Sequence, residues 1–285
     1  MKKIGFIDHY INEWHADNYP RMIAESSLGT EFEVALAWEE TCPAGKKPID
    51  AWCADIGIAK AESIEQVVEE CDCLIVLSPD NPERHEDLSR LPLASGKPVY
   101  VDKPFADSLA AGKRMVELAK AHKTPLMSSS ALRFDSTVDE TLKMVEGKRV
   151  DFVTTRGPGQ FGVYGIHQVE PLVAIMGTGA TRVMQCGNEA CKLMVIDYAD
   201  GRRGAVNLVP NAPFQFMVSY GEGQMRAVNT MSDFFPRFIE AMLAFFQTGQ
   251  QTFPIEQTLE ITALLEAGGA ALGKMDTWVS LEVRG

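Results

Sequence analysis

Apolar positions in the first half of the chain alternate between two periods. Short apolar runs, typical of strands buried on both faces, lie at residues 4–7, 33–38, 72–77, 98–101 and 125–128. The segments between them carry apolar residues at helical spacing, over residues 19–27, 63–71, 83–95 and 108–122. This alternation predicts an α/β domain with a Rossmann-like, doubly wound parallel sheet. We assign it to residues 1–125.

The second half of the chain has a different pattern, in which strands follow one another through short turns. Strands are predicted at residues 150–156, 181–186, 190–198, 204–209, 214–220 and 224–228. Asp200 and Gly201, between two of these strands, are a strong hairpin signal. Helical patterns follow at 232–247 and 256–272, and a last apolar segment at 278–283. We expect residues 126–285 to form an α+β domain with a mostly antiparallel sheet, whose tail could cross back.

Composition narrows the classes of function. Of the 285 residues, 46% are hydrophobic and 23% are charged, as in ordinary soluble proteins. The formal net charge of −12 would repel nucleic-acid backbones and anionic lipid, and no run of Lys or Arg offsets it. We therefore expect neither nucleic acid nor membrane as a partner. No apolar run approaches the roughly 18 residues that span a bilayer, and the N-terminal segment is typical of a strand rather than a signal peptide.

The six cysteines include no C-x-x-C pair. A chain of this size needs no disulfides for stability, so we interpret them as reduced thiols of a cytoplasmic protein. Zinc-site spacings are also absent, and no metal site is expected from them.

In a doubly wound sheet, ligands bind outside the carboxyl ends of the strands. The candidate site residues are therefore those that directly follow each predicted strand. They are residues 8–12, 39–40, 78–81, 102–104 and 129–133.

Several of these segments fall in recognisable motifs. Residues 74–105 read LIVLSPDNPERHEDLSRLPLASGKPVYVDKPF, and a helical stretch follows that ends in Arg133-Phe134. Further on, GVYGIHQVEPLVAIMG contains His167. Together these segments resemble the Gfo/Idh/MocA oxidoreductases. Asp102-Lys103-Pro104 stands where that family has Glu-Lys-Pro, and His167 stands at the histidine of its Gly-x-His-x-x-Asp segment.

The resemblance implies an NAD(P)-dependent oxidoreductase that acts on a sugar, polyol or related small hydroxy compound. Lys103 would contact the reacting hydroxyl or carbonyl, His167 would transfer the proton, and the Lys103–Pro104 bond would be cis. Glu39 or Glu40 would accept from the adenosine ribose and favour NAD. We expect the cofactor to be bound by Asp8, Tyr10, Asn12, Glu39, Ser78, Pro79, His85, Lys103 and Pro104.

Less specific interpretations exist for each residue. Lys-Pro after a strand is common, and an apolar helix such as that of His167 can carry a packed or capping histidine. His85 can equally cap or decorate the surface of its helix. His122 is expected to be a solvated helix-end residue.

Two positions depart from the family pattern. Residues 8–14, DHYINEW, contain no glycine, although this turn should let a pyrophosphate approach a helix N-terminus. Val163 replaces an acid that assists His167 in many relatives, while Glu170 stands at the usual Asp three residues after it. The loop is either a relaxed surface loop or a replacement site. A metal site formed by Asp8, His9, His15 and Asp17 is conceivable, but its spacing is generic and none is expected.

These departures keep two hypotheses open. In the first, the chain is the oxidoreductase described above. In the second, it has lost dinucleotide binding and is a small-ligand binding or regulatory protein, or a non-redox enzyme. In both we expect a homodimer or homotetramer through the C-terminal sheet. The apolar positions that fit such an interface are Val206, Leu208, Phe214, Phe216 and Val218.

Overall fold

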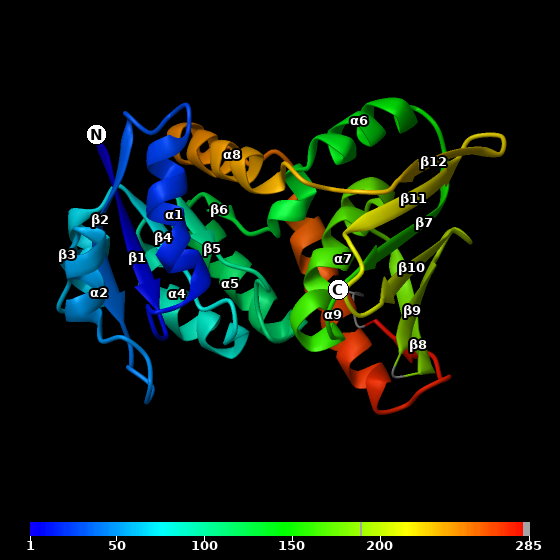
Figure 1. Cartoon of the computed structure of the whole chain (residues 1–285), viewed down its shortest axis with the longest axis horizontal. Coiled ribbons are helices and arrows are strands. Elements are labelled where there is room, and N and C mark those ends of the chain that lie inside the picture. The colour runs from blue at the N-terminus through cyan, green and yellow to red at the C-terminus, as the bar shows by residue number, and fades with distance from the viewer. Residues whose placement is uncertain (189, 282–285) are drawn as a thin grey trace. The chain divides into compact units, whose positions relative to one another are not determined.

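The computed structural model describes residues 1–188 and 190–281 and divides them into two compact units (Figure 1). The first unit comprises residues 1–129 and 239–253, and the second comprises residues 130–238 and the chain from Pro254 onward. The boundary predicted between residues 125 and 126 differs from this division, because residues 126–129 include the last strand of the first sheet. The segment that returns to the first unit is 239–253 and not the tail.

The first unit contains a six-stranded parallel sheet in the order β3-β2-β1-β4-β5-β6. This confirms the Rossmann-like prediction. The strands are β1 (Lys2–Asp8), β2 (Phe32–Glu39), β3 (Ala59–Lys60), β4 (Cys73–Val76), β5 (Val99–Val101) and β6 (Leu126–Met127). The direction of the strand order reverses between β1 and β4, which is where such sheets bind their ligands.

Five helices connect these strands. They are α1 (Trp14–Glu25), α2 (Ile49–Ile56), α3 (Ile64–Glu70), α4 (His85–Ala94) and α5 (Leu109–His122). The short 3-10 helix η1 (Pro82–Arg84) precedes α4. Two local contacts position α3. Ser63 Oγ accepts from Gln66 N at the start of α3, at 3.3 Å. Gly5 of β1 lets α3 pack closely, since a Cβ there would lie 2.3 Å from Val67 Cγ1. Helix α2 and strand β3 were not predicted.

The second unit contains a mixed, mostly antiparallel sheet, as predicted. It has seven strands in the order β12-β11-β7-β10-β9-β8-β13, and β7 and β10 are the one parallel pair among the described residues. Its strands are β7 (Val150–Gly157), β8 (Ala180–Asn188), β9 (Cys191–Tyr198), β10 (Arg203–Leu208), β11 (Gln215–Tyr220), β12 (Gln224–Val228) and β13 (Val279–Ser280). Its helical segments are η2 (Ala131–Phe134), α6 (Ser136–Val145), α7 (Phe161–Met176), α9 (Ile255–Leu272) and the first residues of α8 (Phe234–Thr248). Residues 282 and 283 of the predicted last apolar segment lie outside the described residues.

Helices α7 and α9 pack on one face of this sheet (Figure 1). Val206 and Leu208 lie on that face, as does Gly204, where a Cβ would lie 3.1 Å from Leu172 Cδ1 of α7. Phe216 and Val218 are buried as well. The proposal that these four side chains form an interface between subunits is therefore wrong, because they are core residues of their own unit.

Candidate functional site

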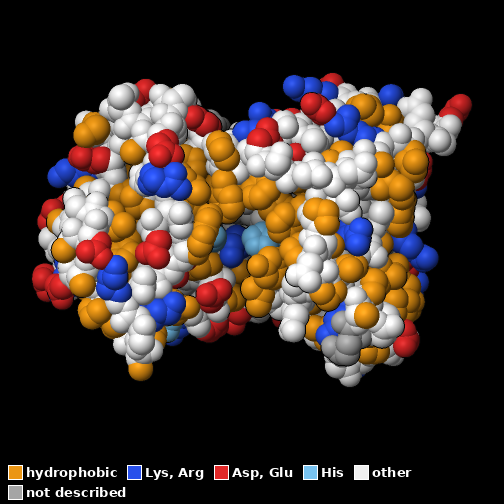
Figure 2. All heavy atoms as spheres, viewed as in Figure 1, with side chains coloured by type: hydrophobic (Ala, Val, Ile, Leu, Met, Phe, Trp, Pro, Cys, Tyr) orange, Lys and Arg blue, Asp and Glu red, His pale blue; other side chains and the backbone are white. Residues whose placement is uncertain are grey.

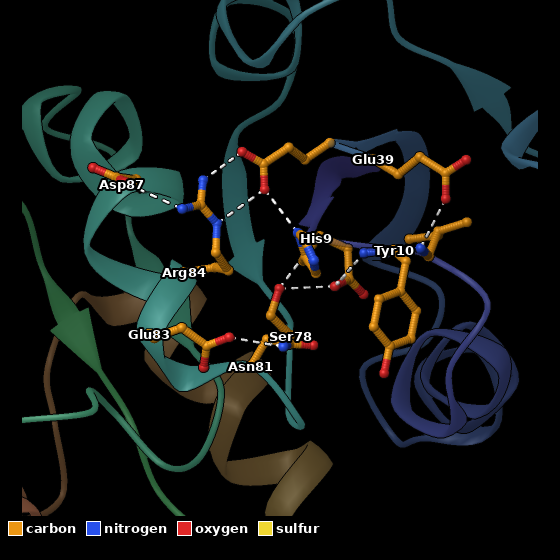
Figure 3. Close-up of polar contacts among 11 residues, drawn as sticks. His9, Tyr10, Glu39, Ser78, Asn81, Glu83, Arg84 and Asp87 are labelled. Carbon is orange, nitrogen blue, oxygen red and sulfur yellow. Dashed lines mark hydrogen bonds and ion pairs between the residues drawn. The ribbon is translucent and has the colours of Figure 1, made fainter. Parts of the chain in front are cut away.

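The carboxyl ends of β1, β4 and β5 bring polar side chains together in the first unit. Asp8 ends β1, and Ser78 follows β4 in a left-handed backbone conformation with φ of 75°. The Ser78 hydroxyl donates to Asp8 Oδ1 and accepts from the His9 backbone N–H, both at 2.8 Å (Figure 3). Asp8 and Ser78, two predicted site residues, are thus joined directly, and together they fix the start of the glycine-free loop.

The loop ends at Glu13, whose carboxylate caps α1. It accepts from the backbone N–H of His15 at 2.7 Å and from that of Ala16. These are two of the N–H groups that a helix leaves unpaired at its first turn. Burial, followed by the charges of Asp8 and Asp102, raises the pKa of Glu13 well above its usual range.

Asp8 is buried, with 1% of its surface exposed. Its Oδ1 also accepts from Tyr10 N at 3.3 Å, whereas its Oδ2 has no hydrogen-bond partner among the described residues. Burial raises the pKa of Asp8 well above its usual range, the Ser78 hydrogen bond opposes this rise, and the charge of Asp102 adds to it. A carboxyl group in this environment favours its protonated form.

Asp102 follows β5 and is completely buried. Burial alone would raise its pKa, but the neighbouring His15 and Lys103 outweigh burial and lower it to about 2. Its Oδ2 contacts His15 Nδ1, and its Oδ1 accepts from the Lys103 backbone N–H at 2.7 Å. The His15 ring stacks on Tyr19, with 4.9 Å between ring centroids. Asp102 and His15 therefore form a buried carboxylate–imidazole pair.

Lys103 lies in the loop that follows Asp102 and is half-buried. Its peptide bond to Pro104 is cis, as the resemblance implies. Its ammonium group makes no hydrogen bond or ion pair with another described residue. Because Asp102 Oδ2 is committed to His15, this cation is available for a ligand.

Glu39 and Glu40, the predicted ribose acceptors, both have partners within the protein. Glu39 accepts from the backbone N–H of Ile11 and of Ile49, each at 3.0 Å. Glu40 binds the Arg84 guanidinium and lies 2.7 Å from His9 Nδ1 (Figure 3). The hydrogen bond with Arg84 is the main reason that the pKa of Glu40 lies below its usual range. Neither carboxylate is free to accept from a ribose in this arrangement.

The other predicted residues of the loop are also engaged. The Tyr10 hydroxyl donates to Asp80 Oδ2 at 3.3 Å, and burial, followed by Asp80, raises the pKa of Tyr10 to about 12. Asn12 Oδ1 accepts from the Lys47 backbone N–H at 3.0 Å. Pro79 is half-buried next to Ser78. These contacts hold the loop against its neighbours in the first unit.

His85 is completely buried, so the surface role considered for it is wrong. Its Nε2 lies 2.6 Å from Leu77 O and its Nδ1 lies 3.1 Å from Phe105 O. Burial lowers the pKa of His85. Both ring nitrogens contact main-chain carbonyls, which favours a role in joining the end of β4 to the segment after Pro104 over contact with a cofactor.

In the second unit, His167 lies on α7 and is half-buried. Its Nδ1 is 2.8 Å from Ser130 Oγ, and its ring lies 5.7 Å from that of Tyr164 and 6.0 Å from that of Phe214. The hydroxyl fixes the orientation of the imidazole, and the aromatic rings form an apolar border. The Ser130 contact was not predicted, although Ser130 lies in the candidate segment 129–133.

One helical turn further along α7, Glu170 forms a buried ion pair with Arg133. Glu170 also accepts from the Ser130 backbone N–H at 3.2 Å, and Arg133 donates to Gln257 Oε1 at 2.7 Å. Glu170, which stands at the family's Asp, is therefore tied to η2. Val163, at the other departure, is 60% exposed.

A dinucleotide, which the Rossmann fold implies, does not fit the residues of the first loop. A pyrophosphate needs free N–H groups at the α1 N-terminus and room for the backbone to approach it. Glu13 accepts two of those N–H groups, and buried Asp8 stands where the turn begins. The carboxyl groups of Asp8 and Glu13 fill the space that a phosphate would need.

No group of three or more His, Cys, Asp or Glu residues within 1–188 and 190–281 is arranged to hold a metal ion. The four residues considered for such a site have different partners. His9 contacts Glu40, His15 contacts Asp102, and Asp17 accepts from Trp52 Nε1 at 2.6 Å. All six cysteines are free thiols, as expected, and burial raises the pKa of Cys71 to about 11 and of Cys73 to about 12.

The distribution of charged side chains on the surface matches a sequence in which no run of Lys or Arg occurs. Figure 2 shows Lys and Arg side chains interspersed with Asp and Glu on the drawn face of each unit. Within the described part of the chain, no helix combines the length and apolarity needed to cross a membrane.

Comparisons with known proteins agree with this architecture. The model of the Gfo/Idh/MocA oxidoreductase family, with its NAD-binding Rossmann fold, matches residues 21–130. The uncharacterized oxidoreductase YhhX of Escherichia coli is 26% identical over 132 residues, a match that spans 40% of this chain and only 38% of that protein. The family match includes Lys103.

Among solved structures, myo-inositol dehydrogenase from Lactobacillus casei, crystallised with NAD(H) and myo-inositol, is similar with a TM-score of 0.83 at 12% identity; the match covers 100% of this chain and 98% of that one. Scyllo-inositol dehydrogenase from the same organism, with bound NAD(H) and scyllo-inositol, has a TM-score of 0.77 at 14% identity, with 98% of each chain covered. Identities this low show the fold alone. Over residues 21–130 the sequence is similar to the Gfo/Idh/MocA family of oxidoreductases.

Proposed function

We propose that the first unit binds a small polyhydroxylated compound, such as a sugar or polyol, through Lys103 and without a dinucleotide. The observation that carries the proposal is the ammonium of half-buried Lys103, which makes no hydrogen bond or ion pair with another described residue and is therefore available for a ligand.

The chemistry of Lys103 suits a hydroxy compound. Its ammonium would polarise a carbonyl or stabilise a developing alkoxide. In the second unit, the imidazole of His167 is oriented by Ser130 Oγ at 2.8 Å and is a group of the kind that transfers protons. The pair of Asp102 and His15 holds the backbone of Lys103, since Asp102 Oδ1 accepts from its N–H.

A second candidate is the NAD(P)-dependent oxidoreductase predicted from the sequence. It is supported by the family match and by relatives of the same fold that were crystallised with NAD(H) and an inositol. The first loop argues against dinucleotide binding, because the side chains of Glu13 and Asp8 occupy the position where the phosphates would bind. The preference for NAD over NADP also loses its support, since Glu39 and Glu40 have other partners.

Isothermal titration calorimetry separates the two candidates. The chain is titrated with myo-inositol, scyllo-inositol and a set of sugars, each with and without millimolar NAD(H) or NADP(H). Binding of a polyol without a nucleotide supports the first candidate, and binding that requires a nucleotide supports the second. If no hydroxy compound binds under either condition, both are rejected.

Lys103→Met tests the role of the lysine, because it removes the charge and keeps most of the side-chain length. We expect at least a tenfold loss of polyol affinity with little change in Tm. The exposed Lys120→Met variant in α5 is the matched control and should bind like the wild type. An unfolded Lys103→Met variant would show that Lys103 is structural, and a folded variant that binds normally would show that Lys103 does not contact the ligand.

A further inference from the structure

We infer that the Glu13 carboxylate permanently occupies the anion site at the N-terminus of α1, so that the first unit excludes the phosphates of a dinucleotide. The site that the Rossmann fold offers to a pyrophosphate is satisfied here by the chain itself. This inference does not depend on which hydroxy compound the protein binds.

The hydrogen bonds at the N-terminus of α1 are the first support for this inference. This helix has 12 residues, and the N–H groups of its first turn would point at a bound anion. His15 N and Ala16 N instead donate to the Glu13 side chain, and Asp17 N donates to Glu13 O at 3.0 Å. The donors that a phosphate would use are therefore already taken.

The charged groups around Glu13 are the second support for this inference. Asp8 and Asp102, both buried, act electrostatically on Glu13. A pyrophosphate placed among three carboxyl groups would meet repulsion from every one that is ionised, with little water to screen it.

The loop is also held in place from outside. Glu39 Oε2 accepts from Ile11 N at 3.0 Å, while its Oε1 accepts from Ile49 N at the start of α2. Asn12 Oδ1 accepts from Lys47 N at 3.0 Å. Displacement of Glu13 by a ligand would therefore have to disturb a loop that is bonded to the segment after β2.

Glu13→Ala tests whether the carboxylate stands in for an anion. Loss of this cap should lower Tm by about 2–8 °C. Inorganic phosphate should restore part of the loss in Glu13→Ala and leave the wild type unchanged, against sodium chloride of the same ionic strength. Glu13→Gln, whose amide oxygen can still cap the helix, should gain little from phosphate. A Glu13→Ala variant that phosphate does not stabilise would contradict the inference.

ADP-ribose tests the same site with the ligand class that it excludes. The wild type should show no calorimetric binding at 1 mM, and Asp8→Gly/Glu13→Ser should bind at least tenfold more tightly than the wild type. Tight binding to the wild type would overturn the inference whatever the result with polyols. If the double variant does not fold, the phosphate experiment on Glu13→Ala decides the question alone.

Discussion

The buried ion pair of Arg133 and Glu170 makes a quantitative prediction about the second unit. The side chains of Arg133 and Glu170 are 8% and 2% exposed. Removing one partner breaks the buried ion pair, which typically costs about 3–5 kcal/mol. We expect Arg133→Met to lower the free energy of unfolding by this amount, a large part of the roughly 5–15 kcal/mol of a typical domain.

Urea unfolding followed by circular dichroism measures this loss. Arg149→Met is the control, because Arg149 pairs with Asp151 at 2.9 Å on the surface of the same unit, with side chains 54% and 46% exposed. Such a pair contributes about 0–1 kcal/mol. The double variant Arg133→Met/Glu170→Leu should regain most of the lost stability, since it leaves no buried charge. If Arg133→Met costs no more than Arg149→Met, Glu170 is not held as an ion and could act as an acid or base beside His167.

Two further predictions concern the first loop and the assembly. Asp8→Asn should raise Tm more at pH 8 than at pH 5. Burial raises the pKa of Asp8 in the folded state. The stability that the protonated Asp8 carboxyl group contributes is therefore complete below the usual pKa of about 3.9 and is lost as pH rises through the folded-state pKa. A larger gain at pH 5 would contradict this sign. Static light scattering should give the mass of two or four chains. We expect the subunits to meet through the face of the second sheet opposite α7 and α9, where Thr154, Asn207 and Met217 line a groove of about 530 Å³. A monomeric mass would refute this association.

Much of the first sheet followed from the sequence because its central strands are buried on both faces. The segment Cys73–Val76 is wholly apolar and buried, which identifies a central strand from its composition. Helix α2 has no such signal, since it has eight residues and follows a loop with two prolines. Strand β3 has two exposed residues and exists only through its pairing with β2.

The sequence predicted where the candidate site lies better than it predicted which side chains contact one another there. Strand ends identified Asp8, Ser78 and Lys103, because topology alone places them at one edge of the sheet. Nothing local in the sequence shows that Asp102 binds His15, which lies 87 positions away. The sequence shows the alternation of apolar and polar residues along β10 and β11, but this alternation does not indicate which face of the sheet the helices cover.

The glycine-free loop is a built structure rather than a relaxed surface segment. A loop released from constraint would expose its charged residues to water, where ionised carboxyl groups are most stable. In this chain Asp8, Ile11 and Glu13 are buried, and the carboxyl groups of Asp8, Glu13 and Glu39 each accept main-chain N–H groups.

Each of these carboxyl groups therefore bears a desolvation cost that only its specific hydrogen bonds offset. A single Gly substitution would leave a neighbouring N–H or carboxyl group unpaired, so the loop can regain a phosphate site only by changing several positions together. This interdependence is why we expect Asp8→Gly/Glu13→Ser to gain ADP-ribose affinity, while Asp8→Gly alone, with Glu13 still capping α1, should gain little.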